Sequence, residues 1–358
     1  MKVLTLVSVW KKKSVSNASR DGSLTSESPR DSLYETTLNS DMFDGRFLEK
    51  VPPFRRNLYR LLPLTVAQVV ETYIVKRRYD AIITWTDAGA LLFALFLKLT
   101  RVRVPHVAMM FWISKPKKAF VLKHVHSHIS RIILWTSAHR DFAIEKLGVP
   151  REKIVYIPHY VDQQFWKPMP GAEDMICSGG REMRDYPTLI EAMRGLDIAC
   201  HIATGNFRGK MEATVKPLYE EIELPPNITV GKKDYLELRA LYARSRFVVV
   251  PLLPSDSDNG LNVILEGMAM GKAVICSRIR GQKDVIQEGK TGLYVPPQDI
   301  SALRTAIRFL WDNPDIAKRI GTAAREHIVA FHSLDNFVSK VKEVVEGVIS
   351  GNPQSGSR

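Results

Sequence analysis

The stretch VVVPLLPSDSDNGLNVILEGMAMGKAVICS, residues 248–277, decides the fold. It opens with three valines, passes through a polar loop, continues with the apolar spacing of a helix, and ends in a second apolar run after Gly271. β-Branched runs favour strands, and two strands joined through a helix are typical of a parallel sheet. The stretch therefore predicts an α/β domain with a helix from Leu261 to Met270, capped by Asp258 or Asn259 and closed at Gly271.

The same stretch carries a candidate anion site. The backbone N–H groups and the positive dipole at the beginning of a helix suit a diphosphate, and Gly260 allows close approach to the backbone. Glu266 lies eight positions after Asp258, a little over two helical turns, so that two carboxylates become available to sugar and ribose hydroxyls. The alternative interpretation is a capped core helix with a solvated glutamate.

Outward from this stretch, short apolar runs alternate with helical patterns along the chain. Two series of this kind predict two Rossmann-like domains, each a parallel sheet with helices on both faces. We expect an N-terminal domain over residues 1–163, a C-terminal domain over 164–334, and a helix at about 335–350 able to pack back on the first domain. Open sheets bind ligands at the carboxyl ends of their strands, which predicts a cleft between the two domains.

The apolar runs also predict the individual elements. In the first series these are strands at Lys2–Trp10, Asp80–Trp85, His106–Trp112 and from Arg131 onward, and helices at Leu58–Lys76, Ala88–Leu99 and Ala119–Ser130. In the second series they are strands at Met175–Ser178, Ile198–Thr204, Phe247–Leu252 and Ala273–Ser277, and helices at Pro187–Arg194, Tyr235–Arg244, Leu261–Met270, Ile300–Asn313 and Pro314–Phe331. The polar stretch that follows the first strand predicts a long loop.

The positive charge of the chain is concentrated in its first part. The formal net charge is +13, and residues 1–160 carry 26 Lys and Arg against 13 Asp and Glu, whereas residues 161–358 are neutral overall. Within residues 51–131 there are 14 basic and 3 acidic side chains. Such a field attracts an anionic partner, for which membrane headgroups, a phosphorylated carrier lipid, an anionic glycan and nucleic acid are candidates. Ordinary solubilising charge is the alternative.

Composition and cysteine usage point to a globular protein of a reducing compartment. The apolar run Ala88–Leu97 is about half as long as a membrane-spanning helix needs to be, and the first residues lack the pattern of a signal peptide. Three cysteines lie far apart in apolar runs, without a CxxC pair: Cys177, Cys200 and Cys276. We therefore expect buried structural thiols and a cytoplasmic location.

Two motifs of this chain resemble those of the retaining glycosyltransferases of family four, which have the GT-B fold of two Rossmann-like domains facing each other across a cleft. That family carries an acidic residue, seven residues, and then a glutamate that opens a run such as LEAMAMGKPVI. This chain has Asp258, NGLNVIL, and Glu266 followed by GMAMGKAVI. The segment SGGREMRDYPTLIEAM, residues 178–193, is similar to the family's glycine and arginine segment. The likeness is nearly continuous over residues 131–350, and earlier residues match only in architecture.

The resemblance implies a role for each residue of the two motifs. The first acid would contact the donor sugar, the glutamate the nucleotide ribose, and the beginning of the helix the diphosphate. Two arginines would grip the diphosphate and offset the charge of the departing nucleotide, for which planar guanidinium groups are well suited. The catalytic candidates are thus Arg181, Arg184 and Asp258, and the donor-binding candidates are Gly180, Gly260, Leu261, Asn262 and Glu266.

The implied activity is transfer of a hexose-type sugar from a UDP- or GDP-linked donor to an acceptor hydroxyl, with retained configuration. The resemblance implies no cofactor and no required metal, and the basic residues 51–131 predict an anionic or lipid-linked acceptor or a peripheral place on the inner membrane face. The chain departs from the family where Asp258 replaces the usual glutamate, where Arg184-Asp185 replaces Lys-Gly, and where the first strand lacks a following Gly-Gly loop.

Other patterns carry weaker hypotheses. His124 and His128 form an i, i+4 pair that could bind a metal, and Asp256-Ser257-Asp258 spells the Asp-x-Asp pattern of metal-dependent transferases. Asp87 is interpreted as a helix N-cap in preference to an acceptor-side polar group. A different GT-B enzyme, such as a sugar-nucleotide epimerase, is the alternative function. A nucleic-acid-binding protein is a further one, although the chain shows no reading motif and no nucleic acid partner is expected.

Overall fold

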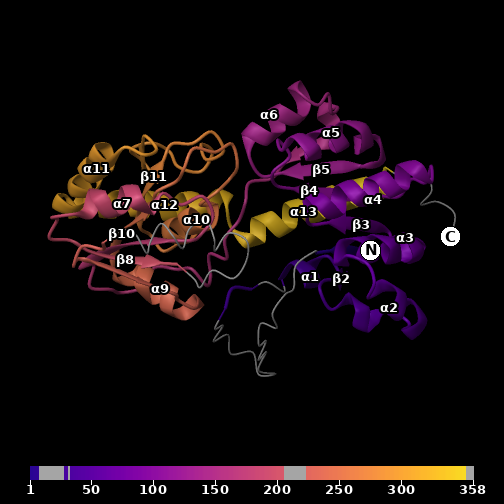
Figure 1. Ribbon diagram of the computed structural model, residues 1–358, viewed down its shortest axis with the longest axis horizontal. Coiled ribbons are helices and arrows are strands. Elements are labelled where there is room, and N and C mark those ends of the chain that lie inside the picture. The colour runs from indigo at the N-terminus through magenta and orange to yellow at the C-terminus, as the bar shows by residue number, and fades with distance from the viewer. Residues whose placement is uncertain (8–27, 31–32, 205–222, 352–358) are drawn as a thin grey trace. The chain divides into compact units, whose positions relative to one another are not determined.

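The computed structural model describes residues 1–7, 28–30, 33–204 and 223–351. These residues fall into two compact units, and the chain passes from the first to the second between Pro158 and His159 and returns after Leu334. Each unit is built around its own six-stranded parallel sheet with helices packed against it (Figure 1). The predicted α/β class with two Rossmann-like sheets is confirmed.

The sheet of the first unit has the strand order β2-β1-β3-β4-β5-β6, and all its neighbouring strands are parallel. Three of these strands are buried over their whole length, which explains why they read as continuous apolar runs in the sequence. The strands are β1 (Val3–Leu6), β2 (Ser40–Phe43), β3 (Ala81–Thr84), β4 (His106–Met110), β5 (Arg131–Leu134) and β6 (Ile154–Tyr156).

The single helix predicted over Leu58–Lys76 is wrong. The structure has two helices there, α2 (Pro53–Tyr59) and α3 (Leu64–Val75), with a break at Pro63. Proline lacks a backbone N–H and disfavours the helical conformation in the residue before it, so the pattern could not continue as one helix. The other helices of this unit are α1 (Leu33–Thr37), α4 (Asp87–Leu99), α5 (Pro116–Val125) and α6 (Ser137–Glu145), with 3-10 turns at Phe47–Lys50, Lys76–Arg78, His126–His128 and Arg151–Lys153.

The C-terminal helix α13 (Leu334–Ser350) belongs to the first unit from Asp335 onward. Its Phe337 is buried, and the centroid of this ring lies 6.0 Å from that of Trp85 and 6.5 Å from that of Trp135. These aromatic contacts explain why the end of the chain folds with its beginning.

The sheet of the second unit has the order β12-β11-β10-β7-β8-β9 and is parallel throughout. Its strands are β7 (Met175–Gly179), β8 (Ala199–Ala203), β9 (Ile228–Gly231), β10 (Ser245–Val250), β11 (Ala273–Ser277) and β12 (Leu293–Val295). Its helices are α7 (Tyr186–Met193), α9 (Tyr235–Arg244), α10 (Leu261–Ala269), α11 (Ile300–Asp312) and α12 (Pro314–Phe331). Apolar side chains form a separate core on each face of this sheet.

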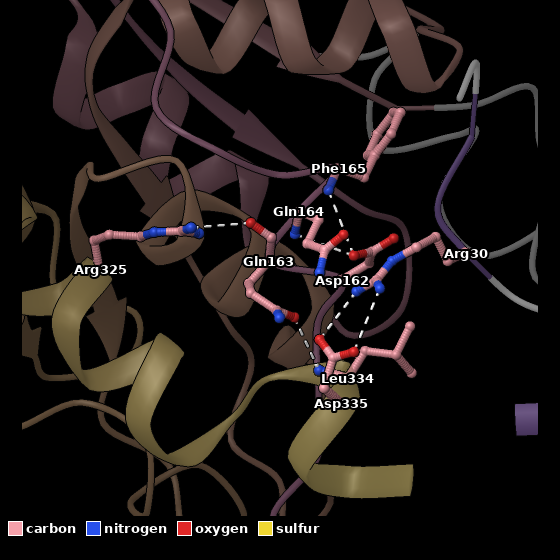
Figure 2. Close-up of polar contacts among 8 residues, drawn as sticks. All are labelled: Arg30, Asp162, Gln163, Gln164, Phe165, Arg325, Leu334 and Asp335. Atoms are coloured by element: carbon pink, nitrogen blue, oxygen red, sulfur yellow. Dashed lines mark hydrogen bonds and ion pairs between the residues drawn. The ribbon is translucent and has the colours of Figure 1, made fainter. Parts of the chain in front are cut away.

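A short segment after His159 is held within the second unit by polar contacts (Figure 2). The backbone N–H groups of Gln164 and Phe165 donate to Oδ1 of Asp162 at 3.1 and 3.4 Å. The backbone oxygen of Gln163 accepts from Arg325 of α12 at 3.0 Å, and its side chain accepts from the Leu334 N–H at 3.2 Å. In the first unit, a bidentate ion pair at 3.1–3.3 Å joins Arg30 to Asp335.

The structure also bears on the predictions made for the cysteines, for membrane-spanning helices and for the polar loop. All three cysteines are free and buried, and burial raises the pKa of each thiol. No helix in the described part of the chain has the length and apolar character needed to cross a membrane. The predicted loop over residues 11–32 lies almost entirely outside the described residues, as do the last three residues of the predicted first strand.

Candidate functional site

The two motifs singled out in the sequence follow two neighbouring strands of the second unit. β7 and β10 are hydrogen-bonded neighbours, although two strands and their connections separate them in the chain. From β7 the chain proceeds to β8 and β9 on one side of the sheet, and it then returns to β10 and continues to β11 and β12 on the other. The strand order therefore reverses between β7 and β10, and this switch point is where open α/β sheets bind ligands.

The loops after these two strands are bonded to each other. The N–H of Asp185 donates to the backbone oxygen of Pro251 at 3.1 Å, and the N–H of Leu253 donates to that of Met183 at 3.0 Å. Arg184 and Leu252 form an antiparallel bridge between these two bonds. The glycine and arginine loop is thus fixed to the loop that leads into α10.

Arg184 is held rigidly at the end of β7. Its Nε donates to the backbone oxygen of Gly179 at 2.8 Å and its Nη1 donates to that of Glu182 at 2.7 Å. The guanidinium lies against Gly180, which has a φ of +92°, and a Cβ at Gly180 would lie 2.1 Å from Nη2 of Arg184. Gly180 is therefore required for the position of the arginine. Arg181 lies on the same loop and is exposed.

The beginning of α10 differs from the prediction. The N-cap is Gly260, with a φ of +86° and no side-chain cap, so the capping role predicted for Asp258 or Asn259 is wrong. Both side chains have partners in the preceding loop: Asp258 accepts from the Ser257 hydroxyl at 3.2 Å, and Asn259 donates to the Ser255 hydroxyl at 3.1 Å. The left-handed conformation at Gly260 lets the chain enter the helix without such a cap.

Gly260 is also confined by its surroundings. A Cβ there would lie 2.9 Å from Cγ1 of Val250 and 3.1 Å from Cδ2 of Leu252. The following residues, Leu261 and Asn262, open the helix, and Asn262 is exposed while Leu261 is buried. The first backbone N–H groups of a helix have no partner within it, so this end of α10 can accept an anion. As predicted, the helix closes at Gly271, which has a φ of +73°.

Glu266 is partly buried on α10, and its carboxyl has a perturbed pKa. Oε2 accepts a hydrogen bond from the Tyr242 hydroxyl at 2.9 Å. Desolvation raises the pKa of Glu266 to about 7, while the Tyr242 hydrogen bond and the charge of Arg184 act in the opposite direction. Arg184 is thus close enough to this carboxyl to lower its pKa.

Tyr242 is the residue of this site that sequence reasoning missed. It lies on α9, it is fully buried, and its ring centroid lies 5.6 Å from that of Trp166. Its phenol is the donor that orients Glu266, 24 residues further along the chain. A tyrosine in an ordinary helical pattern gives no signal of this role, because the contact depends on how α9 and α10 pack on the sheet.

The structure thus brings together most of the predicted donor-site residues. Gly180, Arg184 and Gly260 are connected through Leu252, and Glu266 lies within the electrostatic reach of Arg184. Arg181, Asp258, Leu261 and Asn262 lie on the loops and helix start that join these residues. The roles assigned to all of these residues remain predictions.

The histidine hypothesis gains no support. Nδ1 of His124 is bonded to the Phe120 backbone oxygen at 2.7 Å, and that of His128 to the Ser127 hydroxyl at 3.0 Å. Across residues 1–7, 28–30, 33–204 and 223–351, no group of three His, Cys, Asp or Glu side chains is arranged to hold a metal ion. The expectation that the reaction needs no metal stays a prediction.

In the first unit, Asp87 does not cap α4, contrary to the prediction. The cap is Thr86, whose hydroxyl accepts from the Gly89 N–H at 3.2 Å. Asp87 instead accepts from the N–H groups of Phe111 and Trp112 at 2.7 and 3.3 Å and forms an ion pair with Lys118. It therefore organises the carboxyl end of β4, next to β3.

A pocket of about 360 Å³ in the first unit lies at the opposite, amino end of β4 and β5. It is lined by basic side chains that include Arg103, Arg131 and Lys153, with residues from the end of α13. Because its walls belong to the first unit, it is distinct from the cluster around Arg184 and Glu266.

Comparisons with known proteins match both halves of the chain. Two family models match consecutive parts of the chain, Glycosyltransferase Family 4 over residues 24–165 and Glycosyl transferases group 1 over residues 173–327. Glycogen synthase of Mycobacterium tuberculosis is 35% identical over 208 residues, which cover 56% of this chain and 50% of that protein. The GDP-mannose-dependent alpha-(1-6)-phosphatidylinositol monomannoside mannosyltransferase of the same species is 24% identical over 259 residues, 66% of each protein.

Among solved structures, Anabaena Alr3699/HepE in complex with UDP-glucose has a TM-score of 0.72 at 17% identity, with 97% of this chain and all of that chain covered. At this identity the likeness concerns the fold, which is GT-B. The chain spans about half the length of the glycogen synthase that it matches. With one family model on each side of the boundary between its two parallel sheets, the chain belongs to glycosyltransferase family 4.

Proposed function

We propose that this protein transfers a sugar from a nucleotide-diphosphate donor to an acceptor hydroxyl, and that the donor binds at the switch point of the second sheet. The observation that carries this proposal is the convergence of Arg184, the beginning of α10 and Glu266 at the carboxyl ends of β7 and β10. A guanidinium, a helix N-terminus and a carboxylate match a nucleotide diphosphate, whose phosphates need cations and whose ribose needs an acceptor.

Each part of the donor then has a partner. The diphosphate lies between the guanidinium groups of Arg181 and Arg184 and the backbone at Gly260 to Asn262, the ribose hydroxyls donate to Glu266, and the sugar lies towards Asp258. During transfer the bond from the anomeric carbon to the diphosphate breaks and a bond to the acceptor oxygen forms. The acceptor proton passes to the departing phosphate oxygen, whose charge the arginines offset.

The finer features of the reaction follow the family. We propose a hexose-type sugar linked to UDP or GDP, since one relative is named for GDP-mannose and one structural neighbour binds UDP-glucose. Retention of configuration and independence from metals and cofactors complete the proposal. The rigid position of Arg184 supports a protein that supplies charge and orientation.

The acceptor side is proposed from the first unit. Residues 51–131 combine 14 basic with 3 acidic side chains, which favours an anionic or lipid-linked acceptor and a peripheral site on the inner face of the cytoplasmic membrane. One relative is named for transfer to a phosphatidylinositol mannoside.

Calorimetry with UDP and GDP, followed by turnover with a panel of nucleotide sugars, tests the donor site. Arg184→Ala should weaken nucleotide binding at least about tenfold and lower turnover by about 10²-fold or more, since it removes a charge-assisted contact to phosphate. Arg194→Ala is the matched control, because this exposed arginine at the other end of α7 pairs only with Glu191 and a backbone oxygen in the described structure.

Unchanged binding and turnover in Arg184→Ala would remove the diphosphate site from the proposal. Mass spectrometry of the products with and without acceptor separates transfer from the alternative sugar-nucleotide epimerase, which converts the donor without any acceptor.

A further inference from the structure

Helix α2 and the turn that follows it expose an unusual number of apolar side chains. The exposed fractions are 74% for Phe54, 59% for Leu58, 81% for Leu61 and 37% for Leu62. The backbone continues in helical fashion beyond Tyr59, since the N–H groups of residues 60 and 61 donate to the oxygens of residues 56 and 58. Phe54, Leu58 and Leu61 follow the i, i+4, i+7 spacing and therefore form one stripe on one face of this segment.

The opposite face of α2 holds the helix to the protein. Tyr59 is buried, and its hydroxyl donates to Oε2 of Glu71 on α3 at 2.9 Å. Arg55 forms an ion pair with the other oxygen of the same carboxylate at 3.2 Å. Buried surroundings and the bond to Glu71 raise the pKa of Tyr59 to about 12, so the phenol stays a donor at physiological pH. The polar face of the helix is thus turned inward and the apolar stripe outward.

Positive charge accompanies this stripe. Between Lys50 and Glu71 the chain has no acidic residue and three arginines. Arg55 is neutralised by Glu71, but Arg56 donates only to the backbone oxygens of Glu49 and Val51, and its charge is not paired with a carboxylate among the described contacts. Arg60 is exposed directly before Leu61. The surface of this segment is therefore apolar, with one exposed cation, Arg60, beside it.

We propose that this segment, Pro53–Pro63, inserts its apolar stripe into the boundary region of an anionic lipid bilayer, with the exposed Arg60 at the headgroups. The inference rests on the proposed function in that it specifies how the acceptor side reaches a lipid surface. An apolar stripe beside an exposed cation fits an anionic bilayer, because the apolar side chains can contact the acyl chains while the cation pairs with anionic headgroups. A second copy of this chain fits poorly, because a symmetric contact through α2 would bring identical arginines together.

Co-sedimentation with vesicles tests the proposal. The unaltered protein should bind vesicles of phosphatidylcholine with added phosphatidylglycerol more tightly than vesicles of phosphatidylcholine alone. The triple change Phe54→Ser, Leu58→Ser and Leu61→Ser should lower partitioning to the anionic vesicles on the order of 100-fold, because three apolar side chains no longer enter the acyl region. Arg60→Glu should lower it about tenfold, with a smaller effect on neutral vesicles.

The matched control removes exposed apolar side chains elsewhere. Leu99 on α4 and Phe331 on α12 are 72% and 56% exposed, and changing both to serine should leave vesicle binding unchanged. A second readout uses Leu58→Cys labelled with a polarity-sensitive dye. The three native cysteines should not react with the dye, because they are buried. The dye emission should shift to the blue with anionic vesicles.

Equal vesicle binding by the triple variant and the unaltered protein would overturn the proposal. A dye emission that does not change with anionic vesicles would overturn it as well. Light scattering distinguishes the other occupant, because loss of a dimer in the triple variant without any vesicle binding would assign the stripe to a second copy. UDP or GDP binding by the triple variant is measured in parallel. Failure of nucleotide binding by the unaltered protein would contradict the proposed function while leaving the vesicle result intact.

Discussion

Raising the pH from 6 to 8 should strengthen nucleotide binding through a single carboxyl group. The pKa of Glu266 is raised to about 7, mainly by desolvation. At that pKa the carboxyl is about one tenth ionised at pH 6 and about nine tenths ionised at pH 8. The ionised carboxylate is an acceptor at both oxygens and forms stronger, charge-assisted hydrogen bonds with the ribose hydroxyls than the protonated group does. Nucleotide affinity should therefore rise about tenfold over this range, equivalent to about 1.4 kcal/mol.

Isothermal titration calorimetry at several pH values measures this effect directly. Glu266→Gln supplies the baseline, since it keeps an oxygen acceptor but does not titrate, and its profile also contains the titration of the nucleotide's own phosphate. The ratio of the two profiles of affinity against pH isolates the contribution of the Glu266 carboxyl. Tyr242→Phe removes a hydrogen bond that lowers the Glu266 pKa, so its midpoint should move to higher pH. Parallel profiles for the unaltered protein and Glu266→Gln would refute the assignment of Glu266 to the ribose.

The same group affects the stability of the unliganded protein. Because the pKa of Glu266 in the folded state is raised above the ordinary value of 4.5, the folded protein binds a proton more tightly than the unfolded chain does. Its contribution to stability is complete below about pH 4.5 and is lost as the pH rises through about 7. The free energy of unfolding should therefore fall less steeply with pH in Glu266→Gln, as measured by urea denaturation.

Three substitutions test other parts of the structure. Gly180→Ala should displace the Arg184 guanidinium, since the new Cβ would lie 2.1 Å from Nη2. Turnover should fall about 10²-fold, while circular dichroism should show an intact fold. Unchanged turnover would contradict the requirement for a fixed Arg184 side chain. Gly260→Ala places a side chain at a φ of +86° against Val250, and urea unfolding should show a loss of about 1–3 kcal/mol, whereas an unaltered midpoint would mean that the turn relaxes freely. Asp87→Asn should cost about 1–3 kcal/mol of stability by breaking the Lys118 ion pair, and calorimetry should show normal nucleotide binding in the second unit.

Much of the architecture could be predicted from local patterns alone. Helices α9 and α12 and strand β11 occur with the predicted boundaries, because a capping residue, a proline at the first turn or a β-branched run marks their ends in the sequence itself. The predicted helix over Leu58–Lys76 was wrong although Pro63 marked its break, because the apolar spacing continues across the proline.

Short edge strands escaped prediction for a different reason. β2, β6 and β12 have three or four residues each and sit at the edges of their sheets, as β9 also does. Their residues are only partly buried, so they lack the continuous apolar run by which the equally short β1 and β3 are recognised.

The sequence by itself determined the α/β class, the division into two sheets, and the two motifs around Arg184 and Glu266, because each depends on residues close together in the chain. Only the tertiary structure decided how these residues act on one another. It placed the Arg184 guanidinium against Gly180, made Gly260 the cap of α10, and set the Tyr242 phenol beside Glu266. The contact between Tyr242 and Glu266 arises because α9 and α10 pack on the same sheet, and no local pattern records it.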